Sequence, residues 1–331
     1  MNGGEQQGVG SEGRASKDGG APRPHPLFLN PAAGSAAAVM SLVKDDPRFA
    51  LTECDPGKMR EQVTDALAAG AQRIVVSGGD GTIGTAAAAI LDSNAKSGHS
   101  TTELAVIPGG TLNHFAHDLG IPADIGSAIE ASLGTNTVSV DAGRVNGRLF
   151  LNTSSTGAYV NFVRLRERLE PQLGYRIASV VALVRMFALL RSVRVEMEVD
   201  GEVRRYRSPL LFIGVGEREV QVPTLGKRVA NGRHGLHVIV VRGGTRMRLV
   251  LVALAAVARG IHAASQSPHL DSFIVDRCTI SMPRNRGNVA VDGELVPMTG
   301  ALKYELVADA LRVVAPASAL EQQPGVAGAA A

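Results

Sequence analysis

Residues 73–91 read RIVVSGGDGTIGTAAAAIL and determine how the first part of the chain folds. The apolar run Arg73–Ser77 predicts a short buried strand, and the Ala-rich stretch Ile83–Leu91 predicts a packed helix. The loop between them consists of Gly78, Gly79, Asp80, Gly81 and Thr82. Glycines allow backbone N–H groups to approach an anion closely, and the start of a helix adds unpaired donors and the positive end of a dipole. The stretch therefore predicts a phosphate-binding unit, with a plain turn before a helix as the alternative.

Asp80 is the unusual member of this loop. A carboxylate repels phosphate unless a divalent cation lies between the two, or unless it accepts a proton or hydrogen bond from the reacting group. The loop therefore suggests a nucleotide together with Mg²⁺.

Two more strand–loop–helix units of this kind lie nearby. The strands, loops and helices are expected at 27–29, 30–35 and 36–43, and at 104–107, 108–111 and 112–119. Another strand is expected at 50–52, followed by a helix at 58–69. In an open parallel sheet such loops meet beyond the carboxyl ends of the strands, where ligands bind. We therefore expect a doubly wound α/β nucleotide-binding domain whose binding edge includes Asn30, Thr52, Gly110 and Thr111.

From about residue 137 the pattern becomes strand-rich. Two hairpins are predicted, one turning at Asn146-Gly147 and one at Asp200-Gly201. Further strands are expected at 210–215, 236–241, 273–282 and 289–291, and a last one at 307–316 that packs back on the first domain. The fold class is therefore α/β, with a second, mostly antiparallel β-rich domain and a ligand cleft between the two. The expected divisions are a disordered tail at 1–24, the nucleotide-binding α/β domain at 25–136, the β-rich domain at 137–306, the final strand at 307–316 and a disordered tail at 317–331.

Composition sets the class of protein. The chain has 331 residues, of which 45% are hydrophobic, enough for two domains with real cores. The two cysteines, Cys54 and Cys278, provide no disulfide framework, which indicates a reducing, cytoplasmic location. No signal peptide is recognised at the start. Aromatic residues make up only 4% of the chain and no basic stripe is interleaved with them, which argues against nucleic acid as a partner.

The net charge of +3 conceals an uneven distribution. Residues 141–260 contain 20 Lys and Arg against 9 Asp and Glu, whereas the remainder contains 14 against 22. Two apolar runs in the basic part, Ile177–Leu190 and Leu249–Ala258, are shorter than the ~20 residues that span a bilayer. They are either core helices whose arginines reach outward or helices that lie against an anionic membrane surface.

Several motifs in order resemble the catalytic domain of the diacylglycerol kinase and sphingosine kinase family, in its bacterial soluble lipid kinase branch. They are Asn30-Pro31 with Gly34, then Thr52, GGDGT at 78–82, PGGTLNHFAHDLGIP at 108–122, Leu173-Gly174-Tyr175-Arg176 and Asp292-Gly293-Glu294. GGDGT alone is shared with NAD kinases and phosphofructokinases, so the PGGT-Leu-Asn segment points to the lipid branch. The resemblance covers roughly residues 25–316.

The resemblance implies an ATP-dependent lipid kinase that acts on a diacylglycerol-like or sphingoid-like hydroxyl at the membrane surface, with ATP and Mg²⁺ as cofactors. It implies Glu294 as the base that deprotonates the lipid hydroxyl, and Asp80 is the rival base or the Mg²⁺-linked partner. From spacing alone, Asp292-Gly293 is equally a hairpin turn. The nucleotide-binding residues expected are Asn30, Thr52, Gly78, Gly79, Asp80, Gly81, Thr82, Ile83, Gly84, Gly110 and Thr111.

The chain departs from the family's pattern at residues 231–236, which read NGRHGL where the family carries Asp-Gly-Leu at a structural Mg²⁺ site. His234 therefore replaces a hard oxygen ligand, and that secondary ion is either absent or replaced by the imidazole. His114 and His117 share one side of a helix, but no third metal ligand is evident. The alternatives to a lipid kinase are a NAD kinase or other soluble-substrate kinase, and a catalytically silent regulator that binds lipid or nucleotide.

Overall fold

A computed structural model describes residues 23–55, 57–97, 102–188, 192–220, 225–229, 232–242, 270–281 and 286–320. The expected helix Leu249–Ala258, most of the expected N-terminal tail and residues 321–331 lie outside these ranges.

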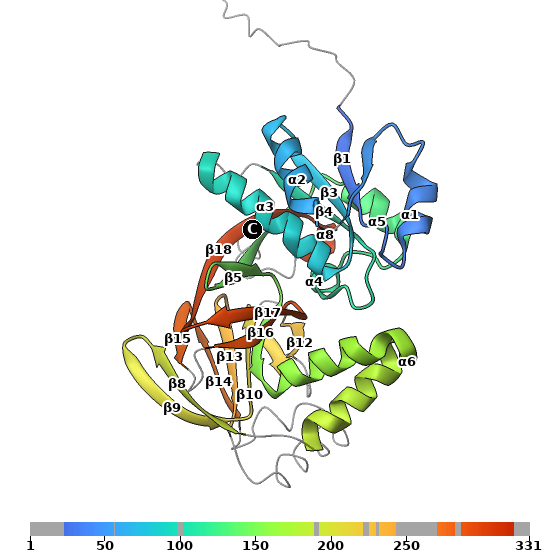
Figure 1. The fold of residues 1–331 in the computed structure, drawn as a ribbon. Helices are drawn as coiled ribbons and strands as arrows, with labels where there is room; N and C mark the ends of the chain where they lie inside the picture. The colour runs from blue at the N-terminus through green and yellow to red at the C-terminus, as the bar shows by residue number, and fades with distance from the viewer. Residues whose placement is uncertain are drawn as a thin grey trace, which may run out of the picture.

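The first half of the molecule is a parallel sheet covered by helices, as predicted (Figure 1). Its strands follow the order β2-β1-β3-β4, and the three pairings are all parallel. The strands are β1 (His25–Leu29), β2 (Phe49–Glu53), β3 (Arg73–Gly78) and β4 (Glu103–Pro108). The helices are α1 (Ala36–Val43), α2 (Met59–Ala68), α3 (Asp80–Ser97), α4 (His114–Asp118) and α5 (Ile125–Ser132). All six residues of β3 are buried, because the strand is central and both faces of the sheet are covered.

The second half packs two sheets face to face. The first sheet continues past β4 in the order β18-β15-β8-β9, with β5 and β6 attached, and the second has the order β14-β13-β10-β7-β16-β17. Their inward residues, among them Met197, Ile213 and Tyr304, form one buried apolar cluster. The strands of the extension are β5 (Thr137–Val145), β6 (Arg148–Phe150), β8 (Val193–Val199), β9 (Glu202–Ser208), β15 (Arg277–Ser281) and β18 (Leu302–Val314). The strands of the second sheet are β7 (Thr153–Gly157), β10 (Leu210–Val215), β13 (Leu236–Val241), β14 (Leu270–Val275), β16 (Arg286–Val291) and β17 (Glu294–Thr299).

Three elements complete the structure. They are the long helix α6 (Ala158–Ala188), the ribbon of β11 (Arg218–Val220) and β12 (Leu225–Arg228), and the short helix α8 (Ala317–Leu320). No helix in the described part of the chain is long and apolar enough to cross a membrane.

Strand β18 links the two halves (Figure 1). Its C-terminal part pairs in parallel with β4, and its N-terminal part pairs with β15. Between these parts, the pairing with β5 shifts register from Val307 to Leu311, and Asp309 adopts a φ of 47°. Such a bulge bends the strand. One hydrogen-bonded sheet therefore passes from the first half into the second.

Both predicted hairpins are confirmed, at β5–β6 and β8–β9. Four other expectations were wrong in detail. Helix α3 begins at Asp80, so Asp80, Gly81 and Thr82 form its first turn and not a loop. The single strand expected at 273–282 is two strands, because the chain leaves one sheet and enters the other at Asp276.

The other two differences concern helices. The apolar run that begins at Ile177 is only the second arm of α6, which begins at Ala158 and bends at Gly174, where φ is 72°. Helix α8 occupies the start of the C-terminal stretch that we expected to be disordered, because Ala319 is buried against the first domain.

Candidate active site

The three predicted loops meet at the carboxyl ends of β1, β3 and β4. The amide of Asn30 donates to Thr82 Oγ1 at 2.9 Å, and the Asn30 carbonyl-type Oδ1 accepts from Ala32 N–H at 3.0 Å. The backbone N–H of Gly109 donates to the carbonyl of Gly78 at 2.8 Å. These bonds fix the loops relative to one another, as the parallel-sheet argument predicts.

Small residues are required here because the loops touch. A Cβ on Gly110 would lie 2.6 Å from the Cα of Gly79, and one on Gly109 would lie 2.8 Å from Ser35 Oγ. Side chains at these positions would force the loops apart. The glycines thus serve loop packing as well as access to backbone N–H groups.

An open cleft of about 910 Å³ lies above these loops. Its lining includes Glu294 from the second domain and six of the predicted nucleotide-binding residues, namely Asn30, Gly79, Gly81, Thr82, Gly110 and Thr111. The remaining predicted residues lie elsewhere. Thr52 lies within β2 and Ile83 is fully buried in the core, whereas Gly84 and Asp80 line a smaller neighbouring cavity. Gly78 is buried at the end of β3.

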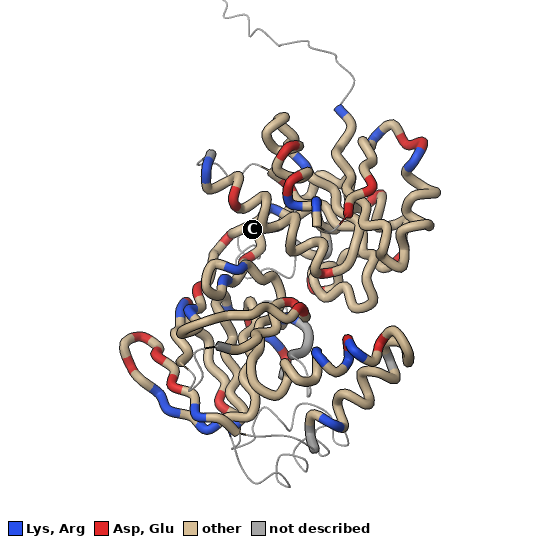
Figure 2. Tube along the Cα trace, viewed as in Figure 1, with Lys and Arg blue, Asp and Glu red and all other residues tan. Residues whose placement is uncertain are grey.

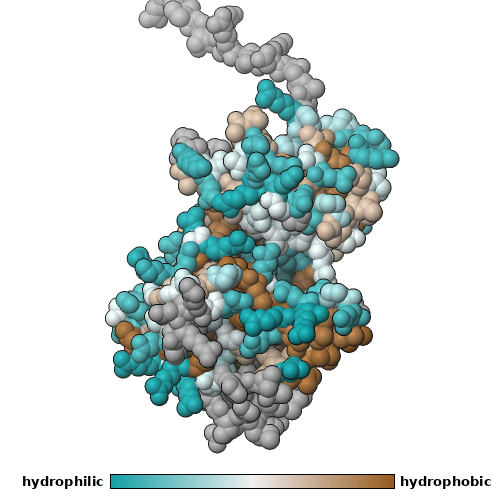
Figure 3. Space-filling model, viewed as in Figure 1, coloured by the Kyte–Doolittle hydropathy of each residue, from teal (hydrophilic) through white to brown (hydrophobic). Residues whose placement is uncertain are grey.

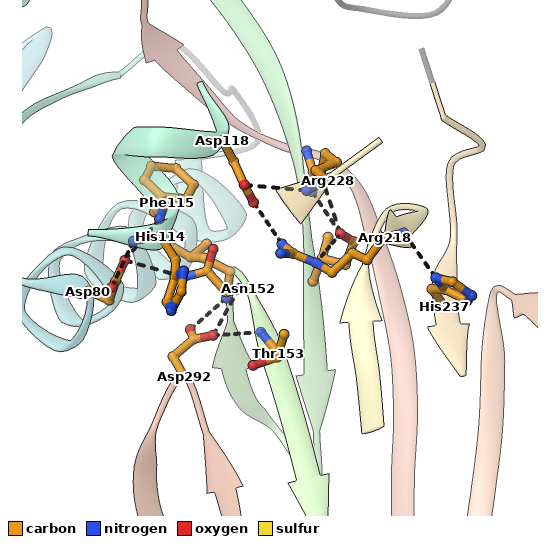
Figure 4. A network of polar contacts seen from close by, with 12 residues as sticks. Asp80, His114, Phe115, Asp118, Asn152, Thr153, Arg218, Arg228, His237 and Asp292 are labelled. Carbon is orange, nitrogen blue, oxygen red and sulfur yellow. Dashed lines mark hydrogen bonds and ion pairs between the residues drawn. The ribbon is translucent and has the colours of Figure 1, made fainter. Parts of the chain in front are cut away.

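Asp80 binds the start of helix α4 (Figure 4). Its two carboxylate oxygens accept the backbone N–H groups of His114, at 3.0 Å, and Phe115, at 2.9 Å. The N-cap residue Asn113 makes no side-chain cap and adopts a left-handed φ of 48°. Asp80 thus supplies the cap from α3, which ties the GGDGT segment to the PGGT segment.

Asp292-Gly293 is both a hairpin turn and part of the site. It joins β16 to β17, and Asp292 has a φ of 46°. Its carboxylate accepts the backbone N–H groups of Leu151, Asn152 and Thr153 at 2.7–2.9 Å. Burial raises the pKa of Asp292 to about 6, although the three N–H donors act in the opposite direction.

Glu294 extends from the same turn over the nucleotide loop. A Cβ on Gly81 would collide with its Oε1, so the carboxylate of the second domain meets the backbone of the first. Arg148 donates to Glu294 Oε2 at 3.2 Å, and the side chain of Glu294 is 54% exposed. Glu294 therefore faces the cleft with one oxygen paired and the other directed at Gly81.

A second cavity of about 290 Å³ adjoins this point. It extends from Gly79, Asp80 and Glu294 to α6 and is lined by aromatic and aliphatic side chains, namely Leu112, Tyr159, Tyr175 and Phe212. Two arginines, Arg166 and Arg218, also reach it. It offers an apolar space beside the carboxylates.

Several residues of the site were not predicted from the sequence. Arg218 pairs with Asp118 at the end of α4 at 3.0 Å, and Arg228 N–H donates to the same carboxylate (Figure 4). Asn152 Nδ2 donates to Asp80 at 3.4 Å. None of these forms a local motif, although the surplus of arginine in this part of the chain was visible.

His234 lies beside a carboxylate. Its Nδ1 is 2.7 Å from the buried Oδ2 of Asp141 on β5, and the other oxygen of Asp141 accepts the N–H of Asp309. In the described residues, no three His, Cys, Asp or Glu side chains form a group that could hold a metal ion. A Mg²⁺ ion bound to a nucleotide needs only one or two protein carboxylates besides the phosphate oxygens. Asp80 and Glu294 are carboxylates beside the cleft. The residues present therefore fit such an ion.

Residues 25–145 match the model of the diacylglycerol kinase catalytic domain. The match covers 121 of the 331 residues, so this part of the chain is similar to that catalytic domain. The similarity agrees with the cleft, because the matched region contains all three loops that form its floor.

Similar proteins carry a lipid kinase name. Proteins named "Probable lipid kinase YegS-like" from Citrobacter koseri and Pseudomonas syringae pv. tomato are 28% and 34% identical to this chain. Each alignment spans 164 residues, which is 49% of this chain and 53% or 50% of the relative. The chain thus matches about half the length of these relatives.

The fold is shared over a greater length. The crystal structure of a diacylglycerol kinase from Bacillus anthracis superimposes with a TM-score of 0.67 over 89% of this chain and 98% of that one, at 20% identity. The parallel-sheet domain and the second, β-rich domain therefore occur together in that fold as well.

Proposed function

We propose that this protein transfers the γ-phosphoryl group of ATP to a hydroxyl of a lipid, of the diacylglycerol or sphingoid type. The observation that carries the proposal is the meeting of Glu294 with Gly81, because it brings a carboxylate of the second domain to the phosphate-binding segment of the first. The similarity of residues 25–145 to the diacylglycerol kinase catalytic domain, and of about half the chain to probable lipid kinases, supports the same reaction.

The larger cleft is suited to the nucleotide. Backbone N–H groups at the start of α3 and the hydroxyls of Thr82 and Thr111 are available for phosphate oxygens. Asn30 holds Thr82 by a hydrogen bond, so its role in this proposal is to orient that hydroxyl. Mg²⁺ would accompany the phosphates and supply charge neutralisation, with Asp80 and Glu294 as the candidate protein ligands.

Glu294 is the proposed general base. An alcohol is a poor nucleophile at neutral pH, and a carboxylate within hydrogen-bond reach takes its proton as the bond to phosphorus forms. Asp80 is less suited to this role, because both of its oxygens already accept backbone N–H groups. Its proposed role is to hold the two phosphate loops together, besides any contact with Mg²⁺.

The second cavity, of about 290 Å³ beside α6, is suited to the acceptor. Its apolar lining would receive the part of the lipid next to the hydroxyl, while Glu294 and the phosphate loops lie at its inner end. Arg166 and Arg218 also line it, and each is paired with a carboxylate: Arg166 with Glu167 and Glu170, and Arg218 with Asp118.

The test is an assay of purified protein with labelled ATP, Mg²⁺ and vesicles of a total lipid extract. We expect labelled lipid from the wild type and a turnover about 10²–10⁴-fold lower from Glu294→Gln, because a general base is lost. Glu305→Gln is a matched control, since Glu305 is likewise exposed and faces an arginine, at 4.0 Å, outside the cleft.

Two results would contradict the proposal. Labelling of NAD with no labelling of lipid would show a soluble-substrate kinase. Nucleotide binding without any labelled product would show a regulator without catalysis. If lipid is labelled but Glu294→Gln retains full turnover, the reaction stands and Glu294 is not the base.

A further inference from the structure

The second arm of α6 presents an aliphatic stripe to solvent. Its members are Leu173, Ile177, Val180, Val181 and Val184, which are 40–65% exposed. Ala178, Ala182 and Met186 on the opposite face are buried against the body of the protein. The sequence left a core helix and a membrane-surface helix as alternatives, and the structure shows one buried face and one exposed apolar face. We call the five exposed residues the α6 stripe.

The α6 stripe is a concentration of exposed apolar surface. Of the nine large hydrophobic residues that are exposed in the described ranges, five lie in these 12 residues. Figure 3 shows the corresponding hydrophobic patch over α6, at the lower right of the molecule. Single exposed aliphatic residues are ordinary, but a contiguous patch marks a surface that contacts a protein, a membrane or a ligand.

Charge indicates which of these partners fits. Arg164, Glu167 and Arg168 are exposed on the first arm and Arg185 is exposed on the second. Helix α6 as a whole contains five Arg and two Glu, and its residues 171–188 contain no Asp or Glu (Figure 2). The surrounding segment 141–260 carries the large surplus of basic residues. An apolar helix face bordered by arginine matches the interface of an anionic bilayer, where aliphatic side chains enter the acyl region and cations remain among the head groups.

Helix α6 also lies beside the cavity that we assign to the lipid. Tyr159, Arg166 and Tyr175 of α6 line the second cavity, of about 290 Å³. Glu294 lines the same cavity. A bilayer against α6 would therefore adjoin the cavity that we assign to the lipid. This use of the cavity rests on the proposed function, whereas the binding itself does not.

A second copy of the chain fits less well. Five aliphatic side chains that are 40–65% exposed offer less than the ~800 Å² that each partner buries in a stable dimer.

We propose that the α6 stripe and its bordering arginines form a docking surface for an anionic lipid bilayer. The protein binds there as a peripheral protein, with α6 lying in the plane of the interface.

The test is co-sedimentation of the full chain with vesicles of phosphatidylcholine, with and without phosphatidylglycerol. The assay contains no nucleotide and measures no turnover, so its outcome is independent of the kinase proposal. We expect binding to the anionic vesicles that falls at least tenfold in the double variant Val180→Gln with Val184→Gln. Arg185→Gln should lower binding about fivefold at low salt, and only to the anionic vesicles.

Val203→Gln is the matched control, because Val203 is 59% exposed on β9, outside the stripe. It should bind as the wild type does, and all variants should unfold at the wild-type temperature because every changed side chain is exposed. The proposal is overturned if the wild type does not bind anionic vesicles, or if the double variant binds as tightly as the control. It is also overturned if sedimentation velocity shows that the double substitution dissociates a dimer while vesicle binding is unchanged.

Discussion

Replacing Gly81 by alanine should separate stability from catalysis. Gly81 is the second residue of α3, and an added Cβ there would collide with Oε1 of Glu294. Gly81 does not have a positive φ, so alanine fits the backbone. The strain therefore falls on the glutamate side chain, which is 54% exposed and free to move into solvent on that side.

The two effects have opposite signs. Alanine is favoured over glycine in a helix by up to about 1 kcal/mol, so Gly81→Ala should unfold at the wild-type temperature or a few degrees above it. The carboxylate, in contrast, must move by about 1 Å to relieve the collision, and a displacement of that size costs about 10²-fold in rate when the displaced group is catalytic. We expect a turnover about 10²-fold lower in a protein that is no less stable.

The assays are thermal unfolding and phosphorylation of a lipid extract, with Gly126→Ala as the matched control. Gly126 is the second residue of α5, and a Cβ there makes only an ordinary contact of 3.5 Å with Asp124. The control should gain similar stability and keep its turnover. Wild-type turnover in Gly81→Ala would refute the argument that Glu294 must lie against Gly81 during the reaction. A large loss of stability would refute the argument that the Glu294 side chain moves away from the added methyl group.

The other predictions concern the bonds that hold the site together. Asp80→Ala should lower the free energy of unfolding by about 1–2 kcal/mol in the absence of nucleotide, because two backbone N–H groups of α4 lose their acceptor. Urea titration measures this change, and an unchanged midpoint would contradict the prediction. In a double-mutant cycle with Asp118→Asn and Arg218→Gln, the two losses of stability should not add, because the charges are buried against each other, whereas additive losses would show that the pair is uncoupled. The pKa of Asp292 rises from an ordinary 3.8 to about 6 on folding, so its contribution to stability is fully present below pH 3.8 and is lost as pH rises through about 6. Asp292→Asn should not share this loss, so its free energy of unfolding in urea should rise relative to the wild type by about 2 kcal/mol between pH 4 and pH 8, and a difference that does not vary with pH would contradict the shift.

Local sequence was sufficient to predict the first domain. The alternation of apolar strand, glycine-rich loop and helix around 73–91 specifies a parallel sheet, and the carboxyl ends of such strands lie at one edge for any sequence of this pattern. The meeting of Asn30, Gly79 and Gly110 followed from that rule alone. The turns at 146–147 and 200–201 were equally predictable, because their residues favour positive φ.

Contacts between segments distant in the chain could not be predicted in this way. Whether Asp292 marks a plain turn depends on the backbone of residues 151–153, which packs around its carboxylate. The capping of α4 by Asp80 and the placement of Glu294 over Gly81 depend on how two domains fit together, and no local pattern encodes that fit. The same holds for the second arm of α6, because residues 177–184 are apolar on every side apart from Ser179. Its amino acids determine that it is a helix, but the packing of Ala178 and Ala182 against the protein determines that Val180 and Val184 face the solvent.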